Sequence, residues 1–97
     1  MKLIITPDAH QWFKDELKVE TGDAIRFLGK VYGATEIHEG FSVGLRLEDP
    51  INPLVKSINE GITYFIEKQD EWFLSGHDLT VNYNKEQEIP AYHFHKK

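Results

Sequence analysis

The chain has 97 residues and no cysteine, and its 11 lysine and arginine residues against 16 aspartate and glutamate residues give a formal net charge of −5. Without cysteine it has no disulfide bond, no thiolate metal ligand and no cysteine nucleophile. The negative charge repels a phosphate backbone and no basic stripe offsets it, so the sequence argues against nucleic-acid binding.

The length and a hydrophobic content of 40% predict one soluble domain over residues 1–97. No stretch approaches the roughly 20 apolar residues of a membrane-spanning helix. The apolar run near the N-terminus, residues 3–5, is too short for a signal peptide. We therefore expect a cytoplasmic protein without a membrane association.

The first half of the chain predicts a short strand, a helix and two longer strands. Residues 3–5 are an apolar strand, and Thr6 and Pro7 favour a helix start, because threonine caps helices and proline suits the first position. The stretch 21–23 is expected to end this helix. Its apolar face has helical spacing and comprises Ala9, Trp12, Phe13 and Leu17. The two strands cover residues 24–28 and 41–48.

Alternation is cleanest in the strand 41–48, where one face is apolar. Gly44 lies on the opposite face and indicates a close backbone approach. The residues predicted to share the apolar face are Phe41, Val43, Leu45 and Leu47.

The second half of the chain predicts a hairpin, a short helix and two more strands. Residues 54–58 and 62–66 form the hairpin, with Gly61 supplying a positive φ at its turn. Residues 68–74 form the helix, which Gly76 closes. The final strands cover residues 79–83 and 90–95. The sum is a β-dominated α+β fold with two short helices and six or seven strands.

Four segments carry a family resemblance in the same order as these elements: residues 3–9, 38–45, 60–67, and 79–83 with its partner strand at 92–94. Together they resemble the HesB-like domain, the fold of the A-type iron–sulfur carrier and scaffold proteins. The resemblance spans essentially the whole chain. It implies a small twisted β-sandwich with two short helices.

The departures from that family concern its metal ligands. The classical members of the family have a cysteine just before a Gly-Phe pair and a Cys-Gly-Cys motif in a C-terminal tail, and these thiolates hold iron or a cluster, often between subunits. Here the first position is His38, and no such tail follows His95-Lys96-Lys97. The sequence is therefore similar to the short, cysteine-free YneR-like branch. The resemblance implies an iron–sulfur biogenesis-type protein without cysteine ligands, acting as a non-enzymatic accessory or metal-binding protein.

His38 is the candidate metal ligand, with Glu36 and Glu39 beside it. A neutral imidazole with flanking carboxylates can hold iron or zinc, and Glu36 and His38 share a face if the segment is extended. The alternative is a histidine in an exposed loop, within a metal-free protein–protein interaction module. A protein partner is expected in both cases, and a second copy of this chain is one candidate.

A second histidine pair, His93 and His95, lies on one face of the last predicted strand, opposite Tyr92 and Phe94. The spacing suits a metal pair. Alternation between an aromatic core face and a polar outer face explains the same pattern, and we favour that interpretation.

No catalytic constellation stands out, so we do not expect an enzyme. Ser75, His77 and Asp78 are too close in sequence for a triad, whose members come from separate elements. His10 lies off the apolar helix face and is predicted to be a surface residue. Paired carboxylates at 15–16, 48–49 and 70–71 are predicted to be solvated.

Two aromatic pairs, Trp12-Phe13 and Trp72-Phe73, fall in the predicted helices. We interpret them as core anchors. If one ring of a pair is exposed, it marks a partner surface.

Overall fold

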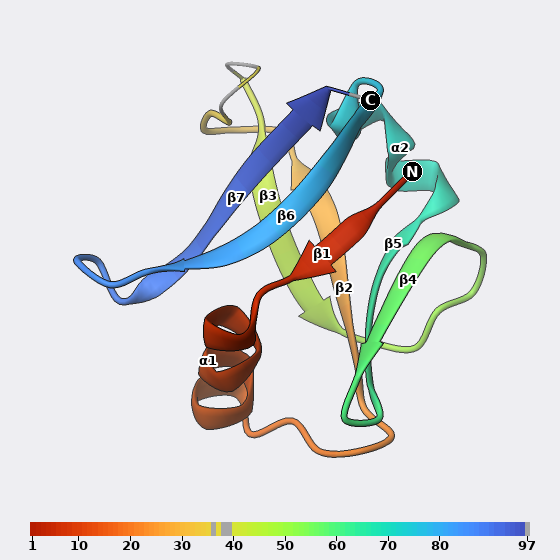
Figure 1. The fold of residues 1–97 in the computed structure, drawn as a ribbon. Helices are drawn as coiled ribbons and strands as arrows, with labels where there is room; N and C mark the ends of the chain where they lie inside the picture. Colours follow the sequence, from red (N-terminus) through yellow and green to blue (C-terminus); the bar gives the residue numbers. More distant parts are fainter. Residues whose placement is uncertain (36, 38–39, 97) are drawn as a thin grey trace.

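The computed structural model describes residues 1–35, 37 and 40–96. Within them, seven strands form two packed sheets, and two short helices lie at the ends of these sheets (Figure 1). This confirms the predicted β-dominated α+β sandwich. The elements in chain order are β1 (Leu3–Ile5), α1 (Pro7–Leu17), β2 (Ala24–Lys30), β3 (Ser42–Leu47), β4 (Pro53–Asn59), β5 (Ile62–Glu67), a 3₁₀ turn (Lys68–Asp70) leading into α2 (Glu71–Leu74), β6 (His77–Asn84) and β7 (Ile89–Lys96).

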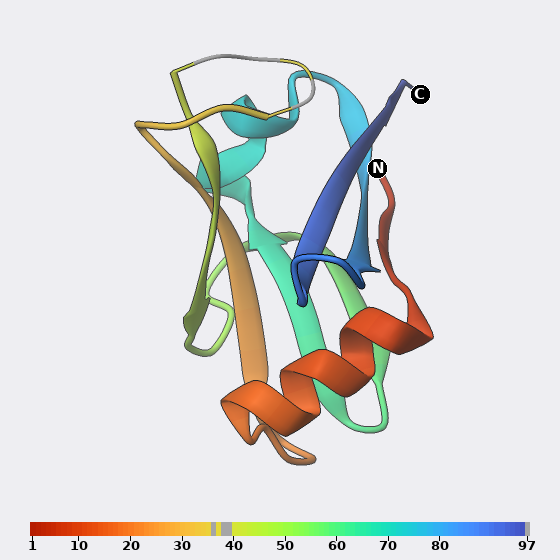
Figure 2. The ribbon, with the colours of Figure 1, turned by 90° about the vertical axis from the view of Figure 1, so that its left-hand side faces the viewer.

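The two sheets have different sizes. One has the order β1-β6-β7, with β1 parallel and β7 antiparallel to β6. The other has the order β3-β2-β5-β4, with a parallel central pair and antiparallel outer strands. Parallel neighbours need a crossover. Between β1 and β6 the chain builds α1, the larger sheet and α2, whereas β2 and β5 are connected through β3 and β4 of their own sheet. α1 lies across one end of the sandwich and α2 lies at the other end (Figure 2).

The core lies between the sheets and is made by the inward face of each strand, as strand alternation requires. Burying each large apolar side chain contributes about 1.5–3 kcal/mol. The fully or almost fully buried residues of the core are Leu3, Ile5, Leu79 and Val81 from the smaller sheet, Ile25, Phe27, Ile62, Tyr64 and Ile66 from the larger sheet, and Ala9, Phe13, Val19, Phe73 and Leu74 from the helices and connections.

The start of α1 is as predicted, but its end is not. The Thr6 hydroxyl accepts a hydrogen bond from the Ala9 N–H at 3.3 Å, and Pro7 occupies the first turn. The helix ends at Leu17, because Lys18 adopts a left-handed conformation with φ 56°. This turn directs Val19 into the core, where it is almost completely buried. The stretch 21–23 therefore follows the helix end instead of forming it.

The β4–β5 hairpin turns through Glu60 and Gly61, whose φ values of 51° and 77° confirm the predicted turn. A Cβ atom on Gly61 would lie 2.5 Å from the Thr21 Cγ2 atom. Both the backbone conformation and the close neighbour therefore require glycine at this position.

The strand β3 follows its predicted alternation except at one end. Val43 and Leu45 pack against the core, and the side chain of Lys30 lies so close to Gly44 that a Cβ there would be 2.8 Å from it. This confirms the predicted close approach. Leu47 is 57% exposed, because it extends past the edge of the core.

None of the helices within the described residues is long and apolar enough to cross a membrane.

Candidate functional site

The predicted metal ligands His38, Glu36 and Glu39 lie outside the described residues. On either side of them, Gly40 donates its N–H to the Gly33 carbonyl at 2.9 Å. In the described part of the chain, no three histidine, aspartate or glutamate side chains gather as they would around a metal ion. Metal binding at His38 therefore stays a prediction.

The histidines of β7 follow the simple alternation that we favoured. His93 lies opposite Thr80 and His95 opposite Asp78 across the β6–β7 pair. Tyr92 and Phe94 point the other way and pack against the core. Burial raises the pKa of the Tyr92 hydroxyl to about 12.

His77 serves the end of α2 and is not part of a triad. Its Nδ1–H lies 3.1 Å from the Leu74 carbonyl oxygen and 2.9 Å from the Ser75 carbonyl oxygen, so it donates to backbone acceptors that the helix leaves open. Asp78 accepts the Lys2 N–H at 2.8 Å. His77 thus stabilises the end of α2, and Asp78 holds the backbone that leads into β1.

One of the predicted solvated carboxylates is not solvated. Asp70 is only 6% exposed, whereas its neighbour Glu71 is exposed as expected. Asp70 binds the guanidinium of Arg26 in β2, with Oδ2 2.6 Å from Nη2. The prediction failed because the charge partner is 44 residues away in the sequence.

The prediction that His10 is a surface residue is also wrong. Its side chain is 12% exposed and bridges two elements. The Nε2 atom is 2.8 Å from the Glu60 carboxylate and the Nδ1 atom is 2.6 Å from the Tyr64 hydroxyl. A carboxylate only accepts, so Nε2 carries a proton and donates to Glu60. In the neutral ring, Nδ1 then accepts from the hydroxyl of Tyr64.

The network around His10 is structural, because the Tyr64 side chain is completely buried and out of reach of a substrate. Burial raises the pKa of the Tyr64 hydroxyl far above its ordinary value. The hydrogen bond from His10, and then that from Lys14 at 3.1 Å, lower the pKa of Glu60. The contacts fasten α1 to the β4–β5 hairpin.

The variant Glu60→Gln is expected to melt below the wild type at about pH 7 and by a smaller margin at about pH 3. The folded-state pKa of Glu60 is lowered from its ordinary 4.5, so its stabilisation is present above that value and is lost as the pH falls through the folded pKa. Thermal unfolding of both proteins at the two pH values checks this. Glu71→Gln, an exposed glutamate without this network, is the control. A gap between wild type and Glu60→Gln that is equal at both pH values contradicts the assignment.

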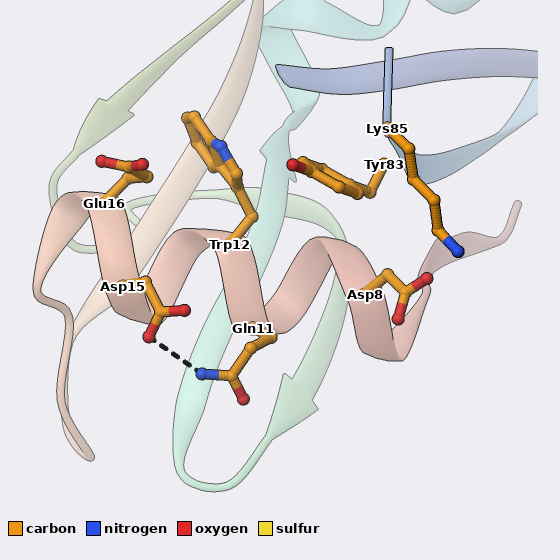
Figure 3. A pocket seen from close by; sticks show the side chains of 7 residues that line it. All are labelled: Asp8, Gln11, Trp12, Asp15, Glu16, Tyr83 and Lys85. Carbon is orange, nitrogen blue, oxygen red and sulfur yellow. Dashed lines mark hydrogen bonds between the residues drawn. The ribbon is translucent and has the colours of Figure 1, made fainter. Parts of the chain in front are cut away.

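A groove of about 360 Å³ lies between α1 and the β6–β7 turn (Figure 3). Trp12 in α1 stands on one side of it and Tyr83 at the end of β6 on the other. The indole N–H of Trp12 donates to the Glu88 carbonyl at 3.0 Å. The remaining lining residues are polar: Asp8, Gln11, Asp15, Glu16 and Lys85.

A second groove of about 370 Å³ lies where the sandwich is open, between the edge strands β3 and β7. Its lining is mainly apolar and includes Val43, Ile89 and Tyr92. On the opposite side of the molecule, β1 lies against β4 and closes the sandwich.

The fold is that of the A-type iron–sulfur biogenesis proteins. The chain matches the crystal structure of Escherichia coli SufA, involved in biosynthesis of iron–sulfur clusters, with a TM-score of 0.63 and 20% identity over 95% of this chain and 79% of that one. It matches IscA with a 2Fe–2S cluster with a TM-score of 0.58 and 18% identity over 97% of this chain and 81% of that one. The HesB-like resemblance is thereby confirmed for the fold. No family model matches the sequence.

Sequence similarity identifies the family more narrowly. The chain is 36% identical over 94 residues to the pyruvate dehydrogenase inhibitor of Bacillus subtilis. This match covers 97% of this chain and 99% of that protein. It is 25% identical over 87 residues to an uncharacterized protein of Staphylococcus saprophyticus, covering 87% of this chain and 89% of that one. The chain belongs to the family of the Bacillus subtilis pyruvate dehydrogenase inhibitor.

Proposed function

We propose that this chain inhibits a pyruvate dehydrogenase by binding to it, as a non-enzymatic member of the cysteine-free YneR-like branch of the HesB-like proteins. The observation that carries the proposal is the 36% identity to the Bacillus subtilis inhibitor over nearly the full length of both chains. Because the proposed target works inside the cell, the proposal also places the chain in the cytoplasm.

The chemistry of the chain supports a binding role over cluster transfer. The sequence has no cysteine, so it offers none of the thiolates that the resembling family uses for iron. Two of the described histidines make structural contacts: His10 bonds Glu60 and Tyr64, and His77 bonds the end of α2. A metal-free interaction module, one of the two alternatives from the sequence, therefore fits better than a cluster carrier.

The purified chain is expected to lower the rate of NADH formation by a purified pyruvate dehydrogenase complex in a saturable manner. Lactate dehydrogenase assayed under the same conditions is the control, because its rate is also followed through NADH and it is not the proposed target. An unchanged pyruvate dehydrogenase rate at a large molar excess of the folded chain would overturn the proposal.

The same assay separates the metal-free role from the predicted His/Glu metal site. We expect the chain to inhibit equally before and after treatment with a chelator, and His38→Ala to inhibit as the wild type does. Inhibition that disappears with the metal, together with iron or zinc in elemental analysis of the untreated protein, supports the metal site at His38, Glu36 and Glu39 instead.

A further inference from the structure

The groove beside α1 is a preformed site with two aromatic walls. Trp12 is held by its hydrogen bond to the Glu88 carbonyl. The turn that carries Glu88 is itself fixed, because the side-chain oxygen of Asn84 accepts the N–H groups of Glu86 and Gln87 at 3.0 and 3.1 Å. Tyr83 lies beside Asn84 at the end of β6 and completes the second wall. A ligand therefore meets rings that are already in position.

The rim of the groove is strongly acidic. Asp8, Asp15 and Glu16 all line it from α1, against the single cation Lys85. The Gln11 side chain donates to Asp15 at 2.9 Å, whereas Asp8 and Glu16 make no ion pair or side-chain hydrogen bond within the described part of the chain. Figure 3 shows the carboxylates spread along the helix beside the two rings. Two carboxylates are thus available to a ligand.

Aromatic rings next to free carboxylates favour one kind of ligand. A cation is attracted to the face of tryptophan or tyrosine and to the carboxylates together. A guanidinium is especially suitable, because it stacks on a ring while its N–H groups bind a carboxylate. Phosphates and carboxylic acids are repelled by the same rim, so the groove does not suit a nucleotide or an α-keto acid.

We propose that this groove docks an arginine or lysine side chain from a basic segment of the protein that the chain inhibits. The identity of that partner rests on the proposed function, whereas the ligand chemistry rests on the groove alone. The volume of about 360 Å³ lies at the lower end of the range of ligand pockets. Through this contact the chain would inhibit by binding to the surface of the enzyme and not by mimicking its substrate.

The proposal is tested first by charge neutralisation. The double variant Asp8→Asn/Glu16→Gln is expected to bind pyruvate dehydrogenase about five- to tenfold more weakly than the wild type in calorimetry, since each exposed charge contact contributes modestly. Glu20→Gln/Glu71→Gln is the matched control, because it makes the same change in net charge with exposed residues that do not line the groove. Lys85→Gln is expected to bind more tightly, because it removes the competing cation. Circular dichroism confirms that each variant is folded.

A second measurement needs no enzyme. The chain has only two tryptophans, Trp12 in the groove and Trp72 in α2, so its indole N–H signals in a nitrogen–proton spectrum provide a reporter and an internal reference. A short arginine-containing peptide is expected to shift the Trp12 signal and leave that of Trp72 in place. A glutamate-containing peptide of equal length is expected to shift neither signal. The peptide response should be lost in Asp8→Asn/Glu16→Gln.

The two measurements distinguish failure of the groove from failure of the proposed function. A Trp12 shift without any inhibition of pyruvate dehydrogenase supports the groove and overturns the function. Inhibition that Asp8→Asn/Glu16→Gln retains in full, with no Trp12 shift on adding the arginine peptide, overturns the groove and leaves the function standing. A double variant that loses no more affinity than Glu20→Gln/Glu71→Gln also overturns the groove, because net charge then explains the effect.

Discussion

Replacing Phe13 with alanine is expected to lower the free energy of unfolding by about 4 kcal/mol. Phe13 is completely buried, and its ring contacts those of Phe27 and Tyr64 in the larger sheet with centroids 5.9 and 5.5 Å apart. The alanine would leave a cavity where α1 meets β2 and β5. Since small domains are stable by only about 5–15 kcal/mol, this loss removes a large part of the total.

Urea denaturation followed by circular dichroism measures the effect of Phe13→Ala. Ile51→Ala is the control, because Ile51 is 90% exposed and its truncation should stay within about 0.5 kcal/mol of the wild type. Phe13→Leu keeps most of the volume and is expected to fall between the two. A Phe13→Ala variant as stable as the Ile51→Ala control would mean that α1 does not pack against the sheet through this ring.

Much of the fold was predictable because its signals are local. Thr6 and Pro7 cap α1 through contacts within one turn. Gly61 turns the β4–β5 hairpin through its own φ of 77°. The inward residues of β6 and β7 follow from simple alternation. Each of these features is decided by a few neighbouring residues, so the sequence contains the information in one place.

The end of α1 was missed for a local reason, the left-handed Lys18, but the failed predictions about burial involve partners far apart in the chain. His10 is drawn inward by Glu60 and Tyr64, which are 50 and 54 residues away. Asp70 is buried by its ion pair with Arg26. A polar residue with polar neighbours in the sequence is predicted to be solvated unless its partner is known. A single sequence has no pattern that identifies a partner so far away in the chain.

The groove was only half predictable, for the same reason. The Trp12-Phe13 pair was interpreted as a core anchor, and an exposed ring was expected to mark a partner surface. Phe13 is buried, whereas the Trp12 ring is half-buried, packs against the core and lines the groove. The other wall and the fixing contact come from Tyr83 and Glu88, and the carbonyl of Glu88 is 76 residues from the indole that it holds. The acidic rim is visible in the sequence, but its position opposite a second ring is not.

Replacing Asp70 with alanine is expected to lower the free energy of unfolding by about 3–5 kcal/mol. Arg26 donates two N–H groups to the same Asp70 oxygen, with Oδ2 3.1 Å from Nε and 2.6 Å from Nη2, and Glu48 binds the remaining arm of the guanidinium at 2.8 Å. Burial alone would lower the pKa of Arg26, but the hydrogen bonds and charges of Asp70 and Glu48 outweigh it and raise the pKa. The variant leaves a guanidinium that is 12% exposed with one partner instead of two.

A double-mutant cycle shows whether the loss comes from the stranded charge or from the missing contact. Glu71→Ala, at the neighbouring exposed position, should be nearly neutral and controls for the change in net charge. Arg26→Met/Asp70→Ala should recover much of the loss, because methionine retains apolar volume without a buried charge. If the double variant is as unstable as the two single variants added together, the residues do not interact, and the larger sheet is held to α2 by packing alone. Recovery in the double variant means that the pair mainly fixes how the start of α2 sits on β2, since an apolar pair then serves stability nearly as well.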